Sequence, residues 1–359
     1  MNLKTTGNLI GRAYISISLF LALAFPVQAT SLEKILQDYL AQQGLSGGVL
    51  LVSAQDQTRV AASGIAMHGA NVAVTPETRF YLASAGKSIV AAAVLGFVEE
   101  GTLQLDEPVW PLIKDIDNID QLANSDAVTL RQLLNHTSGL PDYLDDDFFA
   151  ASEKQPQKQW PPSQAIAFAL GSPPTNEPGR RFEYSNTNYV LLGHILTGIS
   201  GSLQVALEEK VFSNARMTQS SVGKPVGTSV LAHGYAGDEF ADVSDLAWAS
   251  VLGDGPIVAS AADLARFAMA LFRDEKIIGA KLLKQMQTGS NADEGYGLGI
   301  GIDGDEWGSW FGHGGSYEGF EADFRYYPDG EVVFVFLTNG NALDDGSILD
   351  TVAESYFGE

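Results

Sequence analysis

Strand-forming segments lie near both ends of this chain, and helix-forming segments occupy the stretch between them. The strand-like runs are residues 47–52, 58–65, 296–302, 321–327 and 332–337. A polar segment between the first two runs is typical of a hairpin, and Pro-Asp-Gly at 328–330 is a tight-turn sequence between the last two. Because strands need partners, the pattern predicts one sheet built from both ends of the chain, with a helical lobe inserted.

The helix-forming segments follow a 3.6-residue periodicity or are apolar throughout. They are residues 31–42, 88–98, 130–134, 163–170, 187–199, 261–271 and 347–357. Residues 88–98 are nearly all apolar and are followed by Glu99, Glu100 and Gly101, which predicts a helix that is buried on all sides and ends at a glycine. We therefore expect an α+β fold, with a sheet lobe at about 30–83 and 280–359 and a helical lobe at about 84–279.

Composition excludes several classes of function. The chain has 44 acidic and 21 basic residues, a formal net charge of −23, and such a surface repels phosphate backbones, so we expect no nucleic-acid partner. It has no cysteine, which excludes disulfides, thiolate nucleophiles and cysteine-ligated metals. No spacing of histidines and carboxylates suggests a metal site either, so we expect no metal and no cofactor.

The first residues of the chain resemble an export signal. Lys4 and Arg12 precede an uncharged, mainly apolar run at 13–25, and Val-Gln-Ala at 27–29 has the form of a cleavage site. The alternative is a membrane anchor, but 13 residues rising ~1.5 Å each cover roughly 20 Å of a ~30 Å hydrocarbon core. We therefore predict a signal peptide at 1–29 and an exported mature chain at 30–359, periplasmic or secreted and without a stable membrane span.

Ser-x-x-Lys occurs three times, and the positions of the three matches differ. A serine becomes nucleophilic when a base lies within hydrogen-bond reach, and a lysine one helical turn later can be that base. The match at 31–34 is typical of an ordinary helix start with a solvated lysine. The match at 221–224 runs into a proline in a Gly-rich loop, where a helical geometry is not expected.

The remaining match, Ser84 and Lys87, opens the most apolar helix of the chain. The free N–H groups and the positive dipole end of a helix N-terminus would lie beside this serine. The alternative interpretation is a helix-capping serine.

Two further elements could complete a site with this pair. Tyr184-Ser185-Asn186 is the only Tyr-x-Asn of the chain; a phenol near an amine can transfer a proton, and an amide can bind a substrate amide. The alternative is a loop tyrosine with an N-capping asparagine.

The third element is His313-Gly314-Gly315-Ser316, just before the strand-rich end of the chain. Glycines permit a close approach of a ligand, and a strand edge offers N–H groups to an oxyanion. The alternative is a Gly-rich turn with an incidental histidine.

The order Ser84-x-x-Lys87, Tyr184-x-Asn186, His313-x-Gly315 resembles the serine β-lactamase and penicillin-binding-protein superfamily. Its details are similar to the branch that holds class C β-lactamases, D-Ala-D-Ala carboxypeptidases, D-aminopeptidases and carboxylesterases. Supporting stretches are Leu133–Pro141, Pro178-Gly179 and Ser260–Phe267. The resemblance spans almost the whole mature chain, and the fold that it implies, an antiparallel sheet with flanking helices plus a mostly helical lobe, agrees with the predicted elements.

The resemblance implies a role for each matched residue. Ser84 would be the acylated nucleophile, and Lys87 would take its proton, alone or together with Tyr184. Tyr184 would return a proton to the leaving group, and Asn186 would orient the acyl-side amide of the substrate. The backbone N–H groups of Ser84 and Ser316 would form the oxyanion hole.

One departure from the family pattern concerns the third element. Where β-lactamases of this branch have Lys-Thr-Gly, this chain has His313-Gly314-Gly315, which replaces a permanent ammonium and a hydroxyl by an imidazole and bare backbone. The resemblance therefore favours D-aminopeptidase, DD-peptidase and esterase activities over efficient β-lactam hydrolysis. No Gly-x-Ser-x-Gly sequence is present, which excludes the α/β-hydrolase interpretation.

Two function classes remain open. The first is an exported serine hydrolase that acts through an acyl-enzyme on a small-molecule or peptide substrate: a D-amino-acid peptide, a D-Ala-D-Ala-like peptide or a small ester. The alternatives are a non-catalytic penicillin-recognising or cell-wall-binding domain, and a true β-lactamase. Oligomeric state is not indicated.

Three expectations concern the surroundings of the site. We expect His136 to form hydrogen bonds within its own loop, and the acidic run in 141–151 to be a solvated loop. Candidates for an aromatic wall beside the site are Tyr143, Trp310, Tyr317 and Phe320.

Overall fold

The computed structural model describes residues 29–358, apart from 56, 225–229, 238, 249–251, 291–294 and 344–346. The predicted signal peptide lies outside the described residues except for Ala29. In the described part of the chain no single helix has the length and hydropathy of a membrane span; only residues 186–200 and 203–215 together, at a bend of 84°, reach those values.

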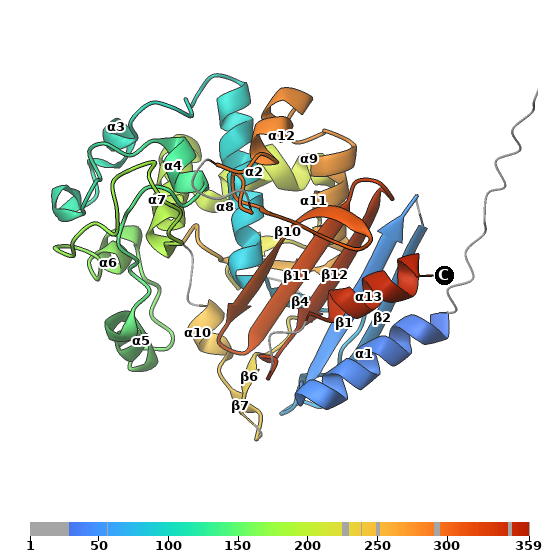
Figure 1. Ribbon diagram of the computed structural model, residues 1–359. Coiled ribbons are helices and arrows are strands. Elements are labelled where there is room, and N and C mark those ends of the chain that lie inside the picture. Colours follow the sequence, from blue (N-terminus) through green and yellow to red (C-terminus); the bar gives the residue numbers. More distant parts are fainter. Residues whose placement is uncertain are drawn as a thin grey trace, which may run out of the picture.

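A seven-stranded antiparallel sheet joins the two ends of the chain, in the order β3-β2-β1-β12-β11-β10-β9 (Figure 1). Its strands are β1 (Gly47–Ala54), β2 (Gln57–Met67), β3 (Val72–Ala73), β9 (Gly301–Asp305), β10 (Gly308–Tyr317), β11 (Phe320–Tyr327) and β12 (Val332–Thr338). β1 pairs with β12 along its whole length, with Leu51 opposite Val335. The fold class predicted from the sequence is therefore confirmed.

Smaller strands and single-turn helices connect this sheet to the rest of the chain. Two small sheets contain β4 (Arg79–Tyr81), β8 (Ile257–Ser260) and β5 (Ser221–Val222), and β6 (Tyr235–Ala236) and β7 (Ala241–Asp242). The 3₁₀ turns are η1 (Ala83–Ala85) and η2 (Ile119–Gln121), and the π-helical turns are η3 (Glu208–Phe212) and η4 (Met269–Arg273).

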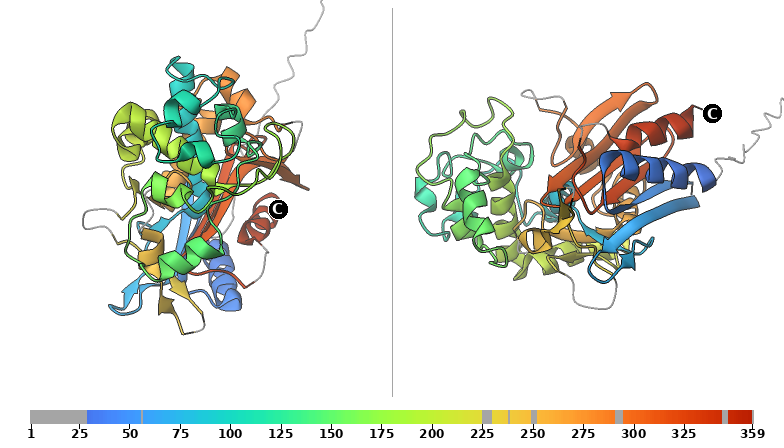
Figure 2. Two further views of the ribbon diagram at one scale, coloured as in Figure 1. Left: turned by 90° about the vertical axis from the view of Figure 1, so that its left-hand side faces the viewer. Right: turned by 90° about the horizontal axis from the view of Figure 1, so that it is seen from below.

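Helices cover both faces of the large sheet. α1 (Ala29–Gln43) and α13 (Ile348–Phe357) lie together on one face, where Leu36, Phe334 and Val352 form part of a buried cluster (Figures 1 and 2). On the other face α11 (Ala261–Ala268) packs against β12 and β1. α11 belongs to the range assigned to the helical lobe from the sequence, and that division into lobes stays a prediction.

In Figure 1, α2 (Gly86–Glu99) stands between the sheet and a group of helices: α3 (Trp110–Ile113), α4 (Leu130–Leu134), α5 (Asp146–Glu153), α6 (Pro162–Ile166) and α7 (Asn186–Ser200). The other helices are α8 (Leu203–Leu207), α9 (Ser213–Ala215), α10 (Ser244–Trp248) and α12 (Ala280–Met286), and α9 and α12 lie on the same side of α2 as α11. α2 is buried from Gly86 to Phe97, as its uninterrupted apolar sequence predicts, and Gly101 follows it with φ +82°.

Two predicted elements differ from the structure. Residues 296–302 were expected to be a strand, but β9 begins only at Gly301, because Gly299 has φ +81°, outside the conformation of a strand, and Gly297 packs so closely on Met286 that a Cβ would lie 1.9 Å from its carbonyl oxygen. The helix expected over 163–170 is α6, which ends at Ile166. The glycines at 312, 314 and 315 lie within strand β10, which excludes the alternative of a Gly-rich turn.

Candidate active site

The first pair of the site, Ser84 and Lys87, lies where η1 passes into α2. Residues three apart share one side of a 3₁₀ turn, so the two side chains meet, with Lys87 Nζ 2.9 Å from Ser84 Oγ. Lys87 is fully buried, and its Nζ also donates to Asn186 Oδ1 at 2.8 Å and to the Asp254 carbonyl oxygen at 2.6 Å. The three acceptors match the three N–H groups of an ammonium.

Backbone strain lies next to the serine. Ala83 has φ +47°, a left-handed conformation that costs a non-glycine residue roughly 1 kcal/mol and that tends to occur at functional sites. The Ala83 carbonyl is packed closely, because a Cβ at Gly255 would lie 2.8 Å from its oxygen. The surrounding chain therefore fixes the backbone that carries Ser84.

Asn186 is the first residue of α7, and its side chain is held by a second residue. Asp142 accepts from Asn186 Nδ2 at 2.9 Å and from the Asn186 backbone N–H at 3.0 Å, which directs Asn186 Oδ1 to Lys87. Ser185, not Asn186, occupies the N-cap position of α7. Burial raises the pKa of the Asp142 carboxyl, partly offset by these hydrogen bonds and by the one from the Leu144 N–H.

Tyr184 lies beside the lysine on a supporting histidine. Its ring centroid is 5.1 Å from Lys87 Nζ, and the ring stacks on His136 at 4.1 Å between centroids. His136 is fully buried with φ +54°, and its Nδ1 accepts from the Ser185 backbone N–H. Burial, reinforced by Lys87, holds the pKa of His136 well below its ordinary value, so the ring is neutral.

The hydrogen bonds of His136 differ from the expectation. They were expected to stay within its own loop, whereas its ring accepts from the Ser185 backbone N–H and contacts Asn188, both in the segment that follows Tyr184. His136 thereby fixes the start of α7 as well as the tyrosine ring.

His313 lies on β10 and its ring is held on both sides. Nδ1–H donates to the Gly314 carbonyl, which leaves Nε2 to accept from the Tyr296 hydroxyl at 2.9 Å. Burial lowers the pKa of His313 to about 4, although the Gly314 carbonyl acts in the opposite direction. The imidazole is therefore neutral at neutral pH, and this position supplies no positive charge.

The end of β10 is packed directly on the turn that carries the serine. A Cβ at Gly315 would lie 2.6 Å from the backbone nitrogens of Ser84 and Ala85 and 2.5 Å from the Leu82 carbonyl oxygen. Only glycine permits this approach. The next residue, Ser316, is exposed, and its Oγ accepts from Asn341 Nδ2 at 3.0 Å.

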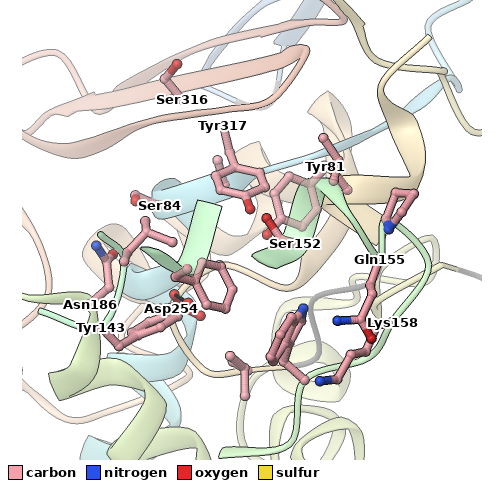
Figure 3. Close-up of a pocket in the computed structure, with 18 of the residues that line it drawn as sticks. Tyr81, Ser84, Tyr143, Ser152, Gln155, Lys158, Asn186, Asp254, Ser316 and Tyr317 are labelled. Atoms are coloured by element: carbon pink, nitrogen blue, oxygen red, sulfur yellow. Dashed lines mark hydrogen bonds between the residues drawn. The ribbon is translucent and has the colours of Figure 1, made fainter. Parts of the chain in front are cut away.

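A cavity of about 180 Å³ opens from Ser84 toward the helical side; we name it the aromatic pocket (Figure 3). The aromatic side chains in its lining are Tyr81, Tyr143, Phe148, Trp160, Tyr184 and Tyr317. Tyr143 and Tyr317 are thus part of the expected aromatic wall. The other two candidates are elsewhere: Phe320 is buried in the core, and Trp310 packs on the Arg325 guanidinium at 4.6 Å.

Asp254 is the acidic residue in the lining of the aromatic pocket. It is 9% exposed, and its Oδ2 accepts from the Tyr143 hydroxyl at 2.6 Å. Its Oδ1 is shielded from solvent and has no hydrogen-bond partner among the described residues. Burial raises the pKa of the Asp254 carboxyl, against the opposing effect of Lys87.

A second cavity, of about 680 Å³, runs from Ser84 across the end of β10 and the start of β11 toward α13; we name it the strand groove. It also contains Tyr184 and residues 313–316, and its acidic members are Glu321 and Asp323. Burial raises the pKa of both carboxyls. None of its described lining residues is a lysine or an arginine.

The structure brings all the predicted site residues together, because each of them lines one of the two cavities except Lys87, which binds Ser84 and Asn186. Those residues are Ser84, Lys87, Tyr184, Asn186, His313, Gly314, Gly315 and Ser316. Of the other Ser-x-x-Lys matches, Lys34 is exposed and pairs with Asp38, and Ser221 lies on β5. In the described part of the chain no cluster of three His, Asp or Glu residues could hold a metal ion.

Two contributors to the site were missed from the sequence. The acidic run at 142–147 was expected to be solvated, which is wrong for Asp142, because its carboxylate binds Asn186. Asp254 carries no motif, and its backbone carbonyl becomes a partner of Lys87 only through the fold.

One family model and several known proteins are similar to this chain in sequence. The family model described as Beta-lactamase matches residues 32–356. A D-aminopeptidase of Brucella ovis is 26% identical over 330 residues, which cover 89% of this chain and 61% of that protein. The chain spans between 25% and 73% of the length of the first curated relatives that it matches.

Two solved structures have the same fold. An octameric penicillin-binding protein homologue from Pyrococcus abyssi has 27% identity and a TM-score of 0.79, over 92% of this chain and 78% of that one. The D-amino acid amidase from Ochrobactrum anthropi SV3, in complex with L-phenylalanine, has 26% identity and a TM-score of 0.74, over 91% and 95%.

Proposed function

Because this chain belongs to the Beta-lactamase family, we propose that it is an exported serine hydrolase that cleaves an amide through an acyl-enzyme on Ser84. The observation that carries the proposal is the fully buried Lys87 amine at 2.9 Å from Ser84 Oγ, beside the ring of Tyr184. A binding domain without turnover has no need of such a proton-transfer set.

In acylation, Ser84 Oγ attacks the substrate carbonyl carbon and loses its proton. Two N–H groups of Lys87 are bound to Asn186 and the Asp254 carbonyl, so a neutral amine would turn its lone pair to Ser84 Oγ. Lys87, alone or with Tyr184, thus takes the proton. The C–N bond of the tetrahedral intermediate then breaks, the leaving nitrogen takes a proton from Tyr184, and the acyl group stays on Ser84.

The negative charge of the intermediate needs backbone donors. Gly315 places β10 against the backbone of Ser84 and Ala85, so the N–H groups of Ser84 and Ser316 are candidates for an oxyanion hole. One such donor stabilises the transition state by roughly 3 kcal/mol in comparable hydrolases. A water molecule then attacks the acyl carbon and gives a proton to the Tyr184 oxygen, the bond between that carbon and Ser84 Oγ breaks, and Ser84 Oγ takes its proton back from Lys87, which releases the acid and restores all three residues.

The two cavities suggest how a substrate lies. We assign the acyl part to the aromatic pocket and the leaving group to the strand groove, since both cavities meet at Ser84 and Tyr184. Two carboxyls and a neutral His313 line the strand groove, and its described lining has no cation for a carboxylate. A substrate whose leaving group has no carboxylate, such as a simple amide, therefore fits the strand groove better than a D-Ala-D-Ala peptide, whose leaving group ends in a carboxylate, and better than a β-lactam.

The test is covalent labelling followed by turnover. A fluorophosphonate should label Ser84, and p-nitrophenyl acetate and amino acid anilides should be hydrolysed, with both properties lost in Ser84→Ala. Ser221→Ala, in a different Ser-x-x-Lys sequence, is the matched control and should keep both. Labelling without turnover of any ester or amide would favour the non-catalytic penicillin-recognising domain, and full activity in Ser84→Ala would overturn the proposal.

Export is proposed from residues 1–29 and needs its own test. Cell fractionation of the full chain, with detection by a C-terminal tag, should place a product lacking about 29 residues outside the cytoplasm. A full-length product that stays in the cytoplasm would contradict export without touching the chemistry.

A further inference from the structure

We propose that Asp254 binds a free ammonium group on the acyl part of the substrate, so that the aromatic pocket takes an amino acid with an unblocked amine and an apolar side chain. The inference rests on the proposed function and names the substrate class of that site.

The charged side chains around Ser84 are not matched in number. One basic side chain, Lys87, lies near two carboxyls, Asp142 and Asp254. Asp142 accepts three N–H groups, from Leu144 and twice from Asn186, which satisfies a carboxylate that is largely removed from solvent. Among the described residues, Asp254 accepts the Tyr143 hydroxyl and is further stabilised by its own backbone N–H, so it has fewer donors than Asp142.

The free atom of Asp254 is Oδ1. It is nearly inaccessible to solvent and has no partner among the described residues, while Oδ2 is bound to Tyr143. A buried carboxylate oxygen without a hydrogen-bond donor destabilises the folded protein, because its lost hydration is not replaced. A cation that binds this oxygen offsets that cost. In the proposed complex the carboxylate rotates about its Cβ–Cγ bond so that Oδ1 faces the aromatic pocket, which Asp254 lines.

Asp254 also lies at the right place along a substrate. Its backbone carbonyl binds the same Lys87 amine that contacts Ser84 Oγ, so the residue lies two hydrogen bonds from the nucleophile. The substituents next to a scissile carbonyl, an α-amino group and a side chain, would occupy this part of the pocket. Figure 3 shows Asp254 and Tyr143 beside Ser84 and Asn186.

The side chains that line the aromatic pocket suit an ammonium group and an apolar side chain. Tyr143 and Tyr317 present aromatic rings near Asp254, and aromatic faces attract cations. Phe148 and Trp160 offer apolar surface for a side chain. The cation in the described lining of the pocket is Lys158, which lies over the Trp160 ring at 3.5 Å, at the end away from Ser84 (Figure 3).

The experiment compares a free amine with a blocked one. Both enantiomers of phenylalanine p-nitroanilide and of its N-acetyl derivative are assayed as substrates, and the corresponding amides as competitive inhibitors of p-nitrophenyl acetate hydrolysis. The variant is Asp254→Asn, which keeps the shape and the acceptor for Tyr143 but loses the charge. The matched control is Asp147→Asn, which removes the same charge from the exposed first turn of α5 beside Phe148.

The wild type should prefer the free amine, as substrate or inhibitor, and Asp254→Asn should lose about ten- to hundredfold of that preference, the worth of one hydrogen bond between charged groups. Asp147→Asn should keep the preference. An equal response to both compounds in the wild type, or an unchanged ratio in Asp254→Asn, overturns the inference. Activity of the wild type on p-nitrophenyl acetate is measured in the same series, so a failed hydrolase proposal is recognised separately.

Discussion

Asp142 accepts two hydrogen bonds from Asn186, one from the backbone N–H at 3.0 Å and one from the side-chain amide at 2.9 Å. A carboxylate only accepts, so the Asn186 amide cannot flip while Asp142 is ionised. Its oxygen is thereby kept 2.8 Å from Lys87 Nζ. A loop residue thus fixes one of the three acceptors around the lysine.

Replacing this carboxylate should slow chemistry more than it weakens binding. In Asp142→Asn the new amide can donate or accept, so Asn186 can flip and present its N–H groups to Lys87, and we expect kcat to fall about tenfold or more with a smaller change in KM. Steady-state kinetics on p-nitrophenyl acetate measure both. Asp145→Asn is the control, because asparagine caps a helix as well as aspartate and Asp145 caps α5. An unchanged kcat in Asp142→Asn would remove the positioning role.

Gly315 and Gly314 form a matched pair on β10. A Cβ at Gly315 meets the backbone of Leu82, Ser84 and Ala85 at 2.5–2.6 Å, whereas the nearest atom to a Cβ at Gly314 is 4.0 Å away. Gly315→Ala should push the strand off the nucleophile turn and lower kcat/KM by about a hundredfold, the loss seen when one oxyanion donor is removed. Gly314→Ala should stay close to wild type in the same assay and in thermal melting. Equal activities of the two variants would contradict the predicted contact.

The sequence predicted the sheet, and it predicted which motif residues the fold brings together, because both depend on local patterns; the catalytic roles of these residues stay predictions. The apolar run after Lys87 predicts a buried helix, and α2 is buried from Gly86 to Phe97. The ends of the chain carry strand patterns, and β1 and β12 pair in the sheet. The three short motifs predict Ser84, Tyr184 and His313 as one group, and the fold brings them to the same two cavities.

The residues that support Lys87 and Asn186, Asp254 and Asp142, could not be predicted from the sequence. Their contacts join positions far apart in the chain, and no motif marks them. Asp254 contributes a backbone carbonyl, which every residue has, across 167 positions to Lys87. Asp142 lies in an acidic run whose charge pattern favours a solvated loop, and only its distance to Asn186 reveals a buried acceptor. The glycines at 312–315 left a turn open as the alternative to a strand edge, and only the fold shows that Gly315 lies in a strand and packs on the backbone of η1.

Stability should depend on the titration of His313. Its pKa is lowered by burial to about 4, below the ordinary 6.5, so between these pH values the unfolded chain binds a proton that the folded chain excludes. The free energy of unfolding therefore rises with pH across this window. Above pH 6.5 neither state binds the proton, so His313 causes no further rise. His313→Gln should show a shallower rise in urea unfolding measured from about pH 4.5 to 7.5. Because His136 titrates with the same sign and remains, the variant should not be flat; identical slopes in both proteins would refute the assignment.

A positive charge in the strand groove should change which leaving group is accepted. Wild type, with its neutral imidazole and the carboxyls of Glu321 and Asp323, should cleave D-alanyl-D-alanine amide faster than D-alanyl-D-alanine itself. His313→Lys should shift the ratio of the two kcat/KM values toward the free carboxylate by about tenfold, as expected for a charge-assisted hydrogen bond.

His194→Lys is the control for that shift. His194 lies on α7, where its ring contacts Asp115 outside both cavities, so this variant adds the same charge away from the site. It should leave the ratio where it is in the wild type. A wild type that prefers the free carboxylate would contradict the assignment of the strand groove as a leaving-group site without a cation. The comparison is made at about pH 7, where His313 is neutral, so that the variant differs from wild type by one full charge.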